Sequence, residues 1–190
     1  MVKWISLALV ILTSTVALVQ AQNSAQKGLM RSQMSFAGGW SFSEKTAKIH
    51  LHCDFEFFLS EKTSLKSDFY YLLATQGESK TFKIQATSLT GGAFHFPKNK
   101  LDFQLSFQPG FAFIKGNENQ LESTNFQEPK LELVPMTALG AGLNYFVHKY
   151  FHLFVHGKYL RGIYLGTSQP AKVSEILVSG GLGFNLTMRR

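Results

Sequence analysis

The chain has 190 residues, which suits one domain and is short for two of ordinary size. Only 16% of the residues are charged, against roughly 25% in a typical soluble domain, so part of the surface is expected to face something other than water. The formal net charge is +7, but Lys and Arg are scattered, which argues against nucleic-acid binding. The single cysteine, Cys53, cannot form an internal disulfide and is expected to act as a small apolar residue.

Residues 1–21 have the features of a cleavable signal peptide. A short positive start precedes an apolar run from Trp4 to Val19, and the run ends in the small-residue triplet Val19-Gln20-Ala21 that is typical of a signal-peptidase site. We therefore expect export and cleavage after Ala21. A retained transmembrane helix is the alternative, because the run approaches the roughly 18–20 residues that can span a bilayer. The sequence after Ala21 contains no second apolar run of helix length, which argues against a multi-helix membrane protein.

The rest of the chain falls into eight segments in which apolar and polar residues alternate. This period of two places successive side chains on opposite faces of a β-strand. The longest run puts these residues on one face: Leu101, Phe103, Leu105, Phe107, Pro109, Phe111 and Phe113. The second segment puts these residues on its polar face: Lys48, His50, His52, Asp54 and Glu56. All charged strand residues are expected on one face, as a sheet with its other face in hydrocarbon requires.

The fourth segment, residues 81–96, alternates less regularly. Its apolar face is assigned Phe82, Ile84, Ala86, Phe94 and Phe96. Its polar face is assigned Lys83, Gln85, Thr87 and His95.

An open sheet in a membrane would leave unpaired backbone groups at its edges, so the first strand must pair with the eighth. We predict an all-β fold: an eight-stranded antiparallel up-and-down transmembrane β-barrel over residues 30–187. A signal peptide (1–21) and a short polar segment (22–29) precede the barrel, and a tail (188–190) follows. Short connections after the second, fourth and sixth strands and longer ones after the third, fifth and seventh, above all 115–130, predict that both termini lie at the periplasmic end. The first connection, near Lys45-Thr46-Ala47, is an exception, because it is short at the end with the longer connections.

Three glycine-spaced stretches carry a resemblance to a known family. They are Phe107-Gln108-Pro109-Gly110, Gly140-Ala141-Gly142-Leu143-Asn144-Tyr145-Phe146 and Ser179-Gly180-Gly181-Leu182-Gly183-Phe184-Asn185-Leu186. Over roughly residues 30–187 the chain resembles the small outer-membrane β-barrel domain family common in Bacteroidota, which is similar in architecture to the transmembrane domain of outer-membrane protein A. The tail after Leu186 departs from barrels that end on an aromatic residue, so Phe184 would have to serve as the insertion signal.

The inward polar residues are the candidate site. His50, His52 and Asp54 alternate along one strand and could converge on a metal, but neighbours on one face stand about 6.5–7 Å apart, and the sequence identifies no fourth ligand. We therefore predict no metal and no cofactor, and instead an interior network of paired charges. Its predicted members are His50, His52, Asp54, Asp102, Glu132, His152, His156, Lys158 and Glu175.

The function predicted from these features is that of a non-enzymatic outer-membrane protein, structural or acting through its extracellular loops. Its expected partners are outer-membrane lipid, lipopolysaccharide and the barrel-insertion machinery. One alternative is a lipid-modifying enzyme of the outer leaflet, although no Gly-x-Ser-x-Gly sequence marks a nucleophile. Another is a soluble lipocalin-like periplasmic carrier, in which the apolar faces would point inward. Eight strands are too few for a wide pore, whichever alternative holds.

Overall fold

A computed structural model of the chain describes residues 26–77, 82–116, 131–164 and 171–187. The signal-peptide prediction, most of the 115–130 connection and the 188–190 tail lie outside these residues. The strands are β1 (Leu29–Ser41), β2 (Thr46–Phe58), β3 (Thr63–Gln76), β4 (Phe82–Lys98), β5 (Leu101–Gly116), β6 (Leu131–His148), β7 (Phe151–Tyr164) and β8 (Ala171–Thr187). Within the described residues we find no helix long and apolar enough to cross a membrane.

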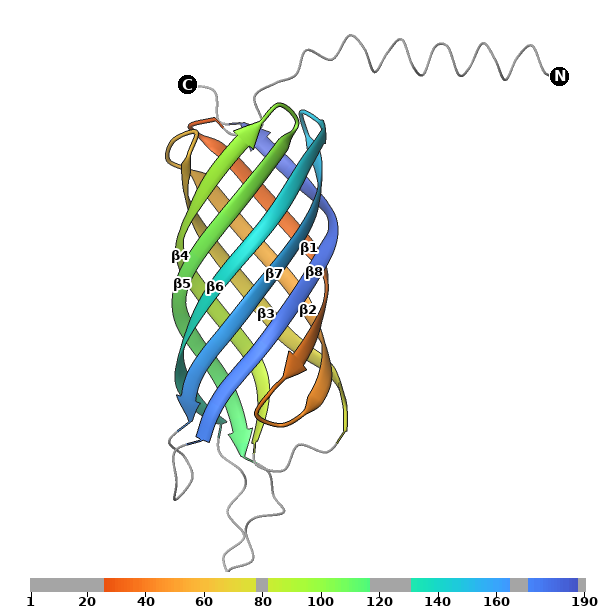
Figure 1. The fold of residues 1–190 in the computed structure, drawn as a ribbon, viewed down its shortest axis with the longest axis vertical. Coiled ribbons are helices and arrows are strands. Elements are labelled where there is room, and N and C mark those ends of the chain that lie inside the picture. Colours follow the sequence, from red (N-terminus) through yellow and green to blue (C-terminus); the bar gives the residue numbers. More distant parts are fainter. Residues whose placement is uncertain (1–25, 78–81, 117–130, 165–170, 188–190) are drawn as a thin grey trace, which may run out of the picture.

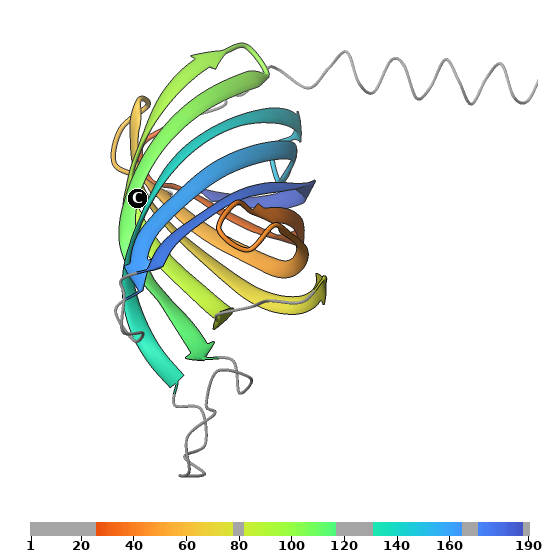
Figure 2. The same ribbon diagram turned by 60° about the horizontal axis from the view of Figure 1, so that its bottom comes forward.

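The eight strands form one closed antiparallel barrel in which each strand pairs with its neighbours in sequence (Figure 1). The barrel closes where β1 pairs with β8, from Leu29 opposite Thr187 to Ser41 opposite Glu175. The tilted view shows this seam, with β8 beside β1 (Figure 2). The predicted eight-stranded barrel is therefore confirmed.

The start of β1 and the end of β8 lie at one end of the barrel, at the top in Figure 1. The connections at this end are short. The one between β4 and β5 consists of Asn99 and Lys100, and Asn99 has the left-handed φ of 55° that such a tight turn favours. The opposite end carries the connections β1–β2, β3–β4, β5–β6 and β7–β8.

Side chains alternate between the two sides of the barrel wall along nearly every strand. On β5, Leu105 and Phe107 are exposed on the outside, whereas Gln104 and Gln108 are buried in the interior. The prediction fails on β4 at Ile84, which was assigned to the outer face but is buried beside Ile114 of β5. The pairing of β4 with β5 shifts register between Ile84 and Ala86, and Ala86, beyond the shift, keeps the predicted outer face opposite the exposed Tyr71. One extra residue in a strand reverses the faces beyond it, which explains the error.

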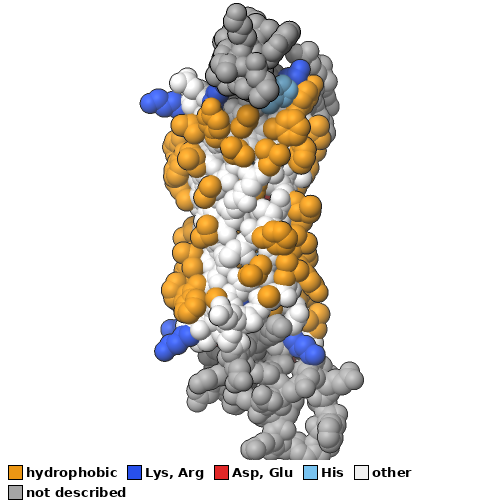
Figure 3. Space-filling view, turned by 90° about the vertical axis from the view of Figure 1, so that its right-hand side faces the viewer, with side chains coloured by type: hydrophobic (Ala, Val, Ile, Leu, Met, Phe, Trp, Pro, Cys, Tyr) orange, Lys and Arg blue, Asp and Glu red, His pale blue; other side chains and the backbone are white. Residues whose placement is uncertain are grey.

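The prediction that every charged strand residue faces the interior is also wrong at the strand ends. Lys98, Lys115, Arg161 and Lys172 are exposed on the outside of the barrel. Figure 3 shows Lys and Arg side chains at both ends of an outer surface covered with hydrophobic side chains. Long cationic side chains at such positions can hold their charge at the membrane–water boundary while the stem lies on apolar surface.

The interior has three zones along the barrel axis. Leu29, Phe58 and Phe146 form a small apolar cluster at the end where the chain enters and leaves the barrel. Buried ion pairs follow, and the far half holds a larger apolar cluster together with the Lys48–Glu175 ion pair. The members of that cluster, called the apolar plug below, are Ala37, Tyr70, Ile84, Leu89, Ala112, Ile114, Val134, Met136, Ala138, Leu160, Val173 and Leu177.

Candidate functional site

Arg31 on β1 is the first centre of the ion-pair cluster, and its side chain is fully buried. Its Nη2 donates to Glu56 Oε2 on β2 at 2.5 Å, and its Nη1 donates to Asp102 Oδ2 on β5 at 2.9 Å. The guanidinium carbon lies 4.7 Å from the centre of the Phe58 ring. Arg31 therefore joins three strands through charge-assisted hydrogen bonds and is covered by an aromatic ring.

His95 on β4 lies between the same two carboxylates. Its Nε2 is 3.0 Å from Glu56 Oε1 and its Nδ1 is 3.0 Å from Asp102 Oδ2. The Ser64 hydroxyl contacts both His95 Nε2, at 2.8 Å, and Glu56 Oε1, at 2.5 Å. The two carboxylates of this site are therefore surrounded by several hydrogen-bond donors.

The order Ser64, His95, Asp102 has the distances of a Ser-His-Asp triad, but its chemistry differs from one. A catalytic histidine must present an unprotonated nitrogen to the serine. The ring of His95 instead has a carboxylate beside each nitrogen, and the Ser64 hydroxyl can donate to Glu56. All three side chains are buried, with the Phe58 ring 4.5 Å from that of His95. The geometry suits a structural hydrogen-bond network.

Two lysines hold the carboxylates deeper in the barrel. Lys66 Nζ donates to Asp54 Oδ2 at 3.0 Å, and Lys158 Nζ lies 2.5 Å from Asp68 Oδ2. Asp68 also accepts from Gln108 Nε2 at 2.6 Å and contacts His52 Nε2 at 2.9 Å. The carboxylates in this layer are therefore held by residues from several strands.

Aromatic and glycine residues position the histidines. The His52 ring stacks on Tyr70 of the apolar plug, with centroids 4.4 Å apart. A Cβ at Gly142 would clash with the His156 ring, so only glycine leaves room for that histidine without a shift. Gly183 makes the same room for His152.

A third group lies nearer the far end of the barrel. Lys48 Nζ donates to Glu175 Oε2 at 3.2 Å, and His50 Nε2 is 3.5 Å from Glu175 Oε1. A Cβ at Gly39 would lie 2.7 Å from Glu175 Oε1, so the glycine gives this carboxylate its space.

The structure brings together most of the residues predicted for the interior network. Eight of the nine predicted residues are buried inside the barrel. The exception is Glu132 near the start of β6, which is half-buried and forms none of the cluster's ion pairs. The residues that the prediction omitted from the network are Arg31, Lys48, Glu56, Lys66, Asp68 and His95. Alternation along their strands places all six inside, and that signal could have found them.

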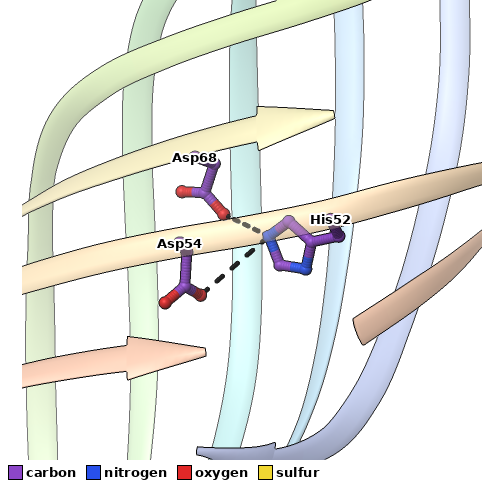
Figure 4. Close-up of side chains that lie close together, drawn as sticks. All are labelled: His52, Asp54 and Asp68. Atoms are coloured by element: carbon purple, nitrogen blue, oxygen red, sulfur yellow. Dashed lines mark hydrogen bonds and ion pairs between the residues drawn. The ribbon is translucent and has the colours of Figure 1, made fainter. Parts of the chain in front are cut away.

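Ligand atoms of His52, Asp54 and Asp68 lie within 4.8 Å of one another, close enough to hold a metal ion (Figure 4). Both aspartates already contact a lysine ammonium, Lys66 for Asp54 and Lys158 for Asp68. A divalent cation here would therefore have to approach two fixed positive charges in a buried space. The arrangement fits ion pairing better than metal ligation.

The fully paired charges in the interior are nearly balanced. The buried cations are Arg31, Lys48, Lys66 and Lys158, and the buried carboxylates are Asp54, Glu56, Asp68, Asp102 and Glu175. Four cations against five carboxylates leave room for one more proton in a neutral cluster. The position of His95 between two carboxylates provides a place for that proton, because a doubly protonated imidazole can donate to both.

The observed faces contradict the lipocalin-like alternative. Such a carrier would point apolar side chains inward around a ligand, and here the large apolar side chains of all eight strands cover the outside.

No known protein family and no curated protein matches this sequence. Solved structures are similar in fold. Neisserial surface protein A is 11% identical, with a TM-score of 0.61, covering 84% of this chain and 96% of that chain. The outer membrane protein OprG from Pseudomonas aeruginosa is 11% identical, with a TM-score of 0.61, covering 87% and 99%. Ail, the attachment invasion locus protein of Yersinia pestis, is 14% identical, with a TM-score of 0.55, covering 85% and 100%. At these identities the chain shares their barrel fold, and the resemblance to a Bacteroidota family stays a prediction.

Proposed function

We propose that the chain is an integral, non-enzymatic protein of a bacterial outer membrane, that its interior is closed to solutes, and that it acts through its extracellular connections. The outer face supports the membrane location. Large apolar side chains such as Phe36, Leu139 and Val155 are exposed there, and among the described residues the charges on that face lie near the strand ends. A closed barrel with this surface satisfies its own backbone in hydrocarbon.

The sealed interior is the observation that carries the proposal. Arg31, Glu56, Lys66 and Asp102 are all 0% exposed, so water does not reach these charges. The Leu29–Phe58–Phe146 cluster covers them on one side, and the apolar plug lies on the other, together with the Lys48–Glu175 pair. An eight-stranded barrel is only just wide enough for its own side chains. This close packing of the described residues supports a barrel without a water-filled channel and without a route for substrate to Ser64 and His95.

An interaction role is then left to the connections at the end opposite the termini. The longest of these in sequence is residues 117–130, which is rich in Asn, Gln and Glu. Polar connections on a rigid scaffold are common sites of partner contact. OprG, one of the similar structures, is an outer membrane protein, which agrees with the proposed location of this chain in an outer membrane.

Cell fractionation and a conductance measurement test the proposal together. The mature protein should stay with outer membranes after a carbonate wash, and its N-terminus should be Gln22. The purified protein should give no steady conductance in planar lipid bilayers. Recovery in the soluble periplasm, or a stable open channel, would overturn the proposal.

Protease treatment of intact cells tests the orientation. Cleavage is expected within residues 115–130, with protection of the Pro97–Lys100 turn at the opposite end. Cleavage only at Pro97–Lys100 would mean that the barrel is inserted the other way round.

A further inference from the structure

Among the residues that the structure describes, the exposed charges at the end opposite the termini are all positive. At this end, the exposed ionisable residues among those described are Lys45, Lys115, Arg161 and Lys172. The described acidic residues nearby, Glu44 and Glu132, are half-buried, and Glu175 points into the barrel. The described part of this rim therefore exposes positive charge, whereas the Glu175 carboxylate of β8 pairs with Lys48 inside the barrel.

Two of these cations lie next to each other on neighbouring strands. Arg161 on β7 is opposite Ser174 on β8, and Lys172 on β8 is opposite Ile163 on β7. Arg161 and Lys172 are thus diagonal partners on the same outer face, about 7–8 Å apart at the backbone. Both side chains are long enough to converge on one anion. Arg can bind phosphate through two parallel hydrogen bonds, and Lys adds a compact charge.

An aromatic surface lies directly beside the pair on the membrane side. Tyr159 precedes Arg161 by two residues on the same face of β7, and its ring centroid lies 6.5 Å from that of Phe42. The backbone of Phe42 is tied to β8 by a hydrogen bond from its N–H to the Ser174 carbonyl, at 3.0 Å. Trp40 is exposed on the same outer face. The cations therefore adjoin a belt of amphipathic and apolar rings, as at a headgroup boundary.

Small outward residues continue this surface toward the middle of the barrel. Gly38 on β1 and Gly157 on β7 both lie opposite Val178 of β8. A Cβ placed on either glycine would meet nothing within 4 Å, so both open to the outside. Figure 3 shows the hydrophobic covering interrupted at mid-height by a pale area of other side chains and backbone. An extended hydrocarbon chain can lie against these two open positions, on either side of the exposed Val178, more closely than against the large rings above.

We propose that this face of β1, β7 and β8 binds lipid A, the phosphorylated glycolipid of the outer leaflet. Arg161 and Lys172 hold a phosphate, the rings of Phe42 and Tyr159 flank the boundary, and an acyl chain lies over Gly157. This inference rests on the proposed function, because the outer-membrane location and the orientation place this rim in the outer leaflet. The phosphate of lipid A accounts for the two neighbouring cations, and its acyl chain accounts for the outward glycines that lie farther along the same face.

Native mass spectrometry of the purified full-length protein tests the proposal, with defined lipid A and phosphatidylglycerol as separate probes. We expect the protein to retain lipid A in preference to phosphatidylglycerol. The double variant Arg161→Gln/Lys172→Gln should weaken lipid A binding by about tenfold or more, since charge-assisted hydrogen bonds are lost. The matched control Lys98→Gln, an exposed cation at the opposite rim, should change it by less than about twofold.

Three outcomes would overturn the inference. They are unchanged lipid A binding by the double variant, an equal loss in the Lys98→Gln control, and equal retention of phosphatidylglycerol, which would indicate general attraction to anionic lipid. Heat-dependent gel mobility checks that every variant is folded. Cell fractionation separates the two proposals: a protein that stays in the outer membrane but lacks lipid A selectivity contradicts only this inference, whereas recovery from the periplasm contradicts the proposed function.

Discussion

Removing the charge of Asp68 tests whether the ion-pair cluster is sealed from water. Asp68 is 2% exposed, and its carboxylate contacts Lys158, Gln108 and His52 at 2.5, 2.6 and 2.9 Å. In Asp68→Asn the shape is kept, but Lys158 becomes a buried cation without its closest anion. Breaking a buried pair in this way costs about 3–5 kcal/mol, so a loss of that size in the free energy of unfolding is expected.

The reverse change should cost less. In Lys158→Met the Asp68 carboxylate keeps its contacts with His52 and Gln108, so the expected loss is about 1–3 kcal/mol. The double variant Asp68→Asn/Lys158→Met leaves no unpaired charge at this position. It should therefore be more stable than the sum of the two single losses predicts, with a coupling free energy of about 0.5–3 kcal/mol.

Urea unfolding of each variant after refolding into lipid vesicles gives these free energies. Lys98→Met is the matched control, because it removes an exposed cation and should change stability by less than about 0.5 kcal/mol. If Asp68→Asn is as mild as this control and the two single losses simply add, the interior is hydrated. The argument for a closed, non-conducting barrel would then be wrong.

Three further variants and one labelling experiment test the faces and the packing of the barrel. Leu105→Arg puts a cation on the outer face of β5 and should destabilise the barrel in vesicles by about 2–4 kcal/mol by urea unfolding, whereas a neutral result would place Leu105 in water. Gly142→Ala should cost about 1–3 kcal/mol in the same assay, because its Cβ would meet Gln104 Nε2 at 2.9 Å and the His156 ring even closer. Gly157→Ala, with open space around its Cβ, should be neutral or slightly stabilising, and equal losses for the two would contradict the packing described here. Cys53, half-buried on the outer side of β2, should resist a water-soluble maleimide in vesicles and react after unfolding; rapid labelling of the folded protein would show that this part of β2 is outside hydrocarbon.

Alternation along single strands was enough to predict the barrel and most of its two faces. On β2, His50, His52 and Asp54 point inward, as their spacing predicts. On β5, the alternate residues from Leu101 to Phe111 point outward, again as predicted. This success has a local cause, since successive side chains of any extended strand lie on opposite sides. The closure of the barrel followed from the backbone N–H and C=O groups at the edges of an open sheet, because hydrocarbon offers them no hydrogen-bond partners.

Local pattern failed where the strand itself is irregular or ends. The register shift between Ile84 and Ala86 reverses the faces of the first part of β4, and no residue type in that part of the strand indicates the shift. The exposed position of Arg161 also breaks the rule that charges face inward, because that rule holds only within the hydrocarbon.

By itself, then, the sequence determined which side chains enter the barrel, and only the tertiary structure decided which of them meet. Arg31 and Asp102 are 71 residues apart, and their contact depends on the registers of all the strands around the barrel. The same holds for His95 between Glu56 and Asp102, and for Arg161 beside Lys172. The inward or outward position of a residue is a property of its own strand, whereas the level at which it sits relative to other strands is set by every turn and by closure of the barrel.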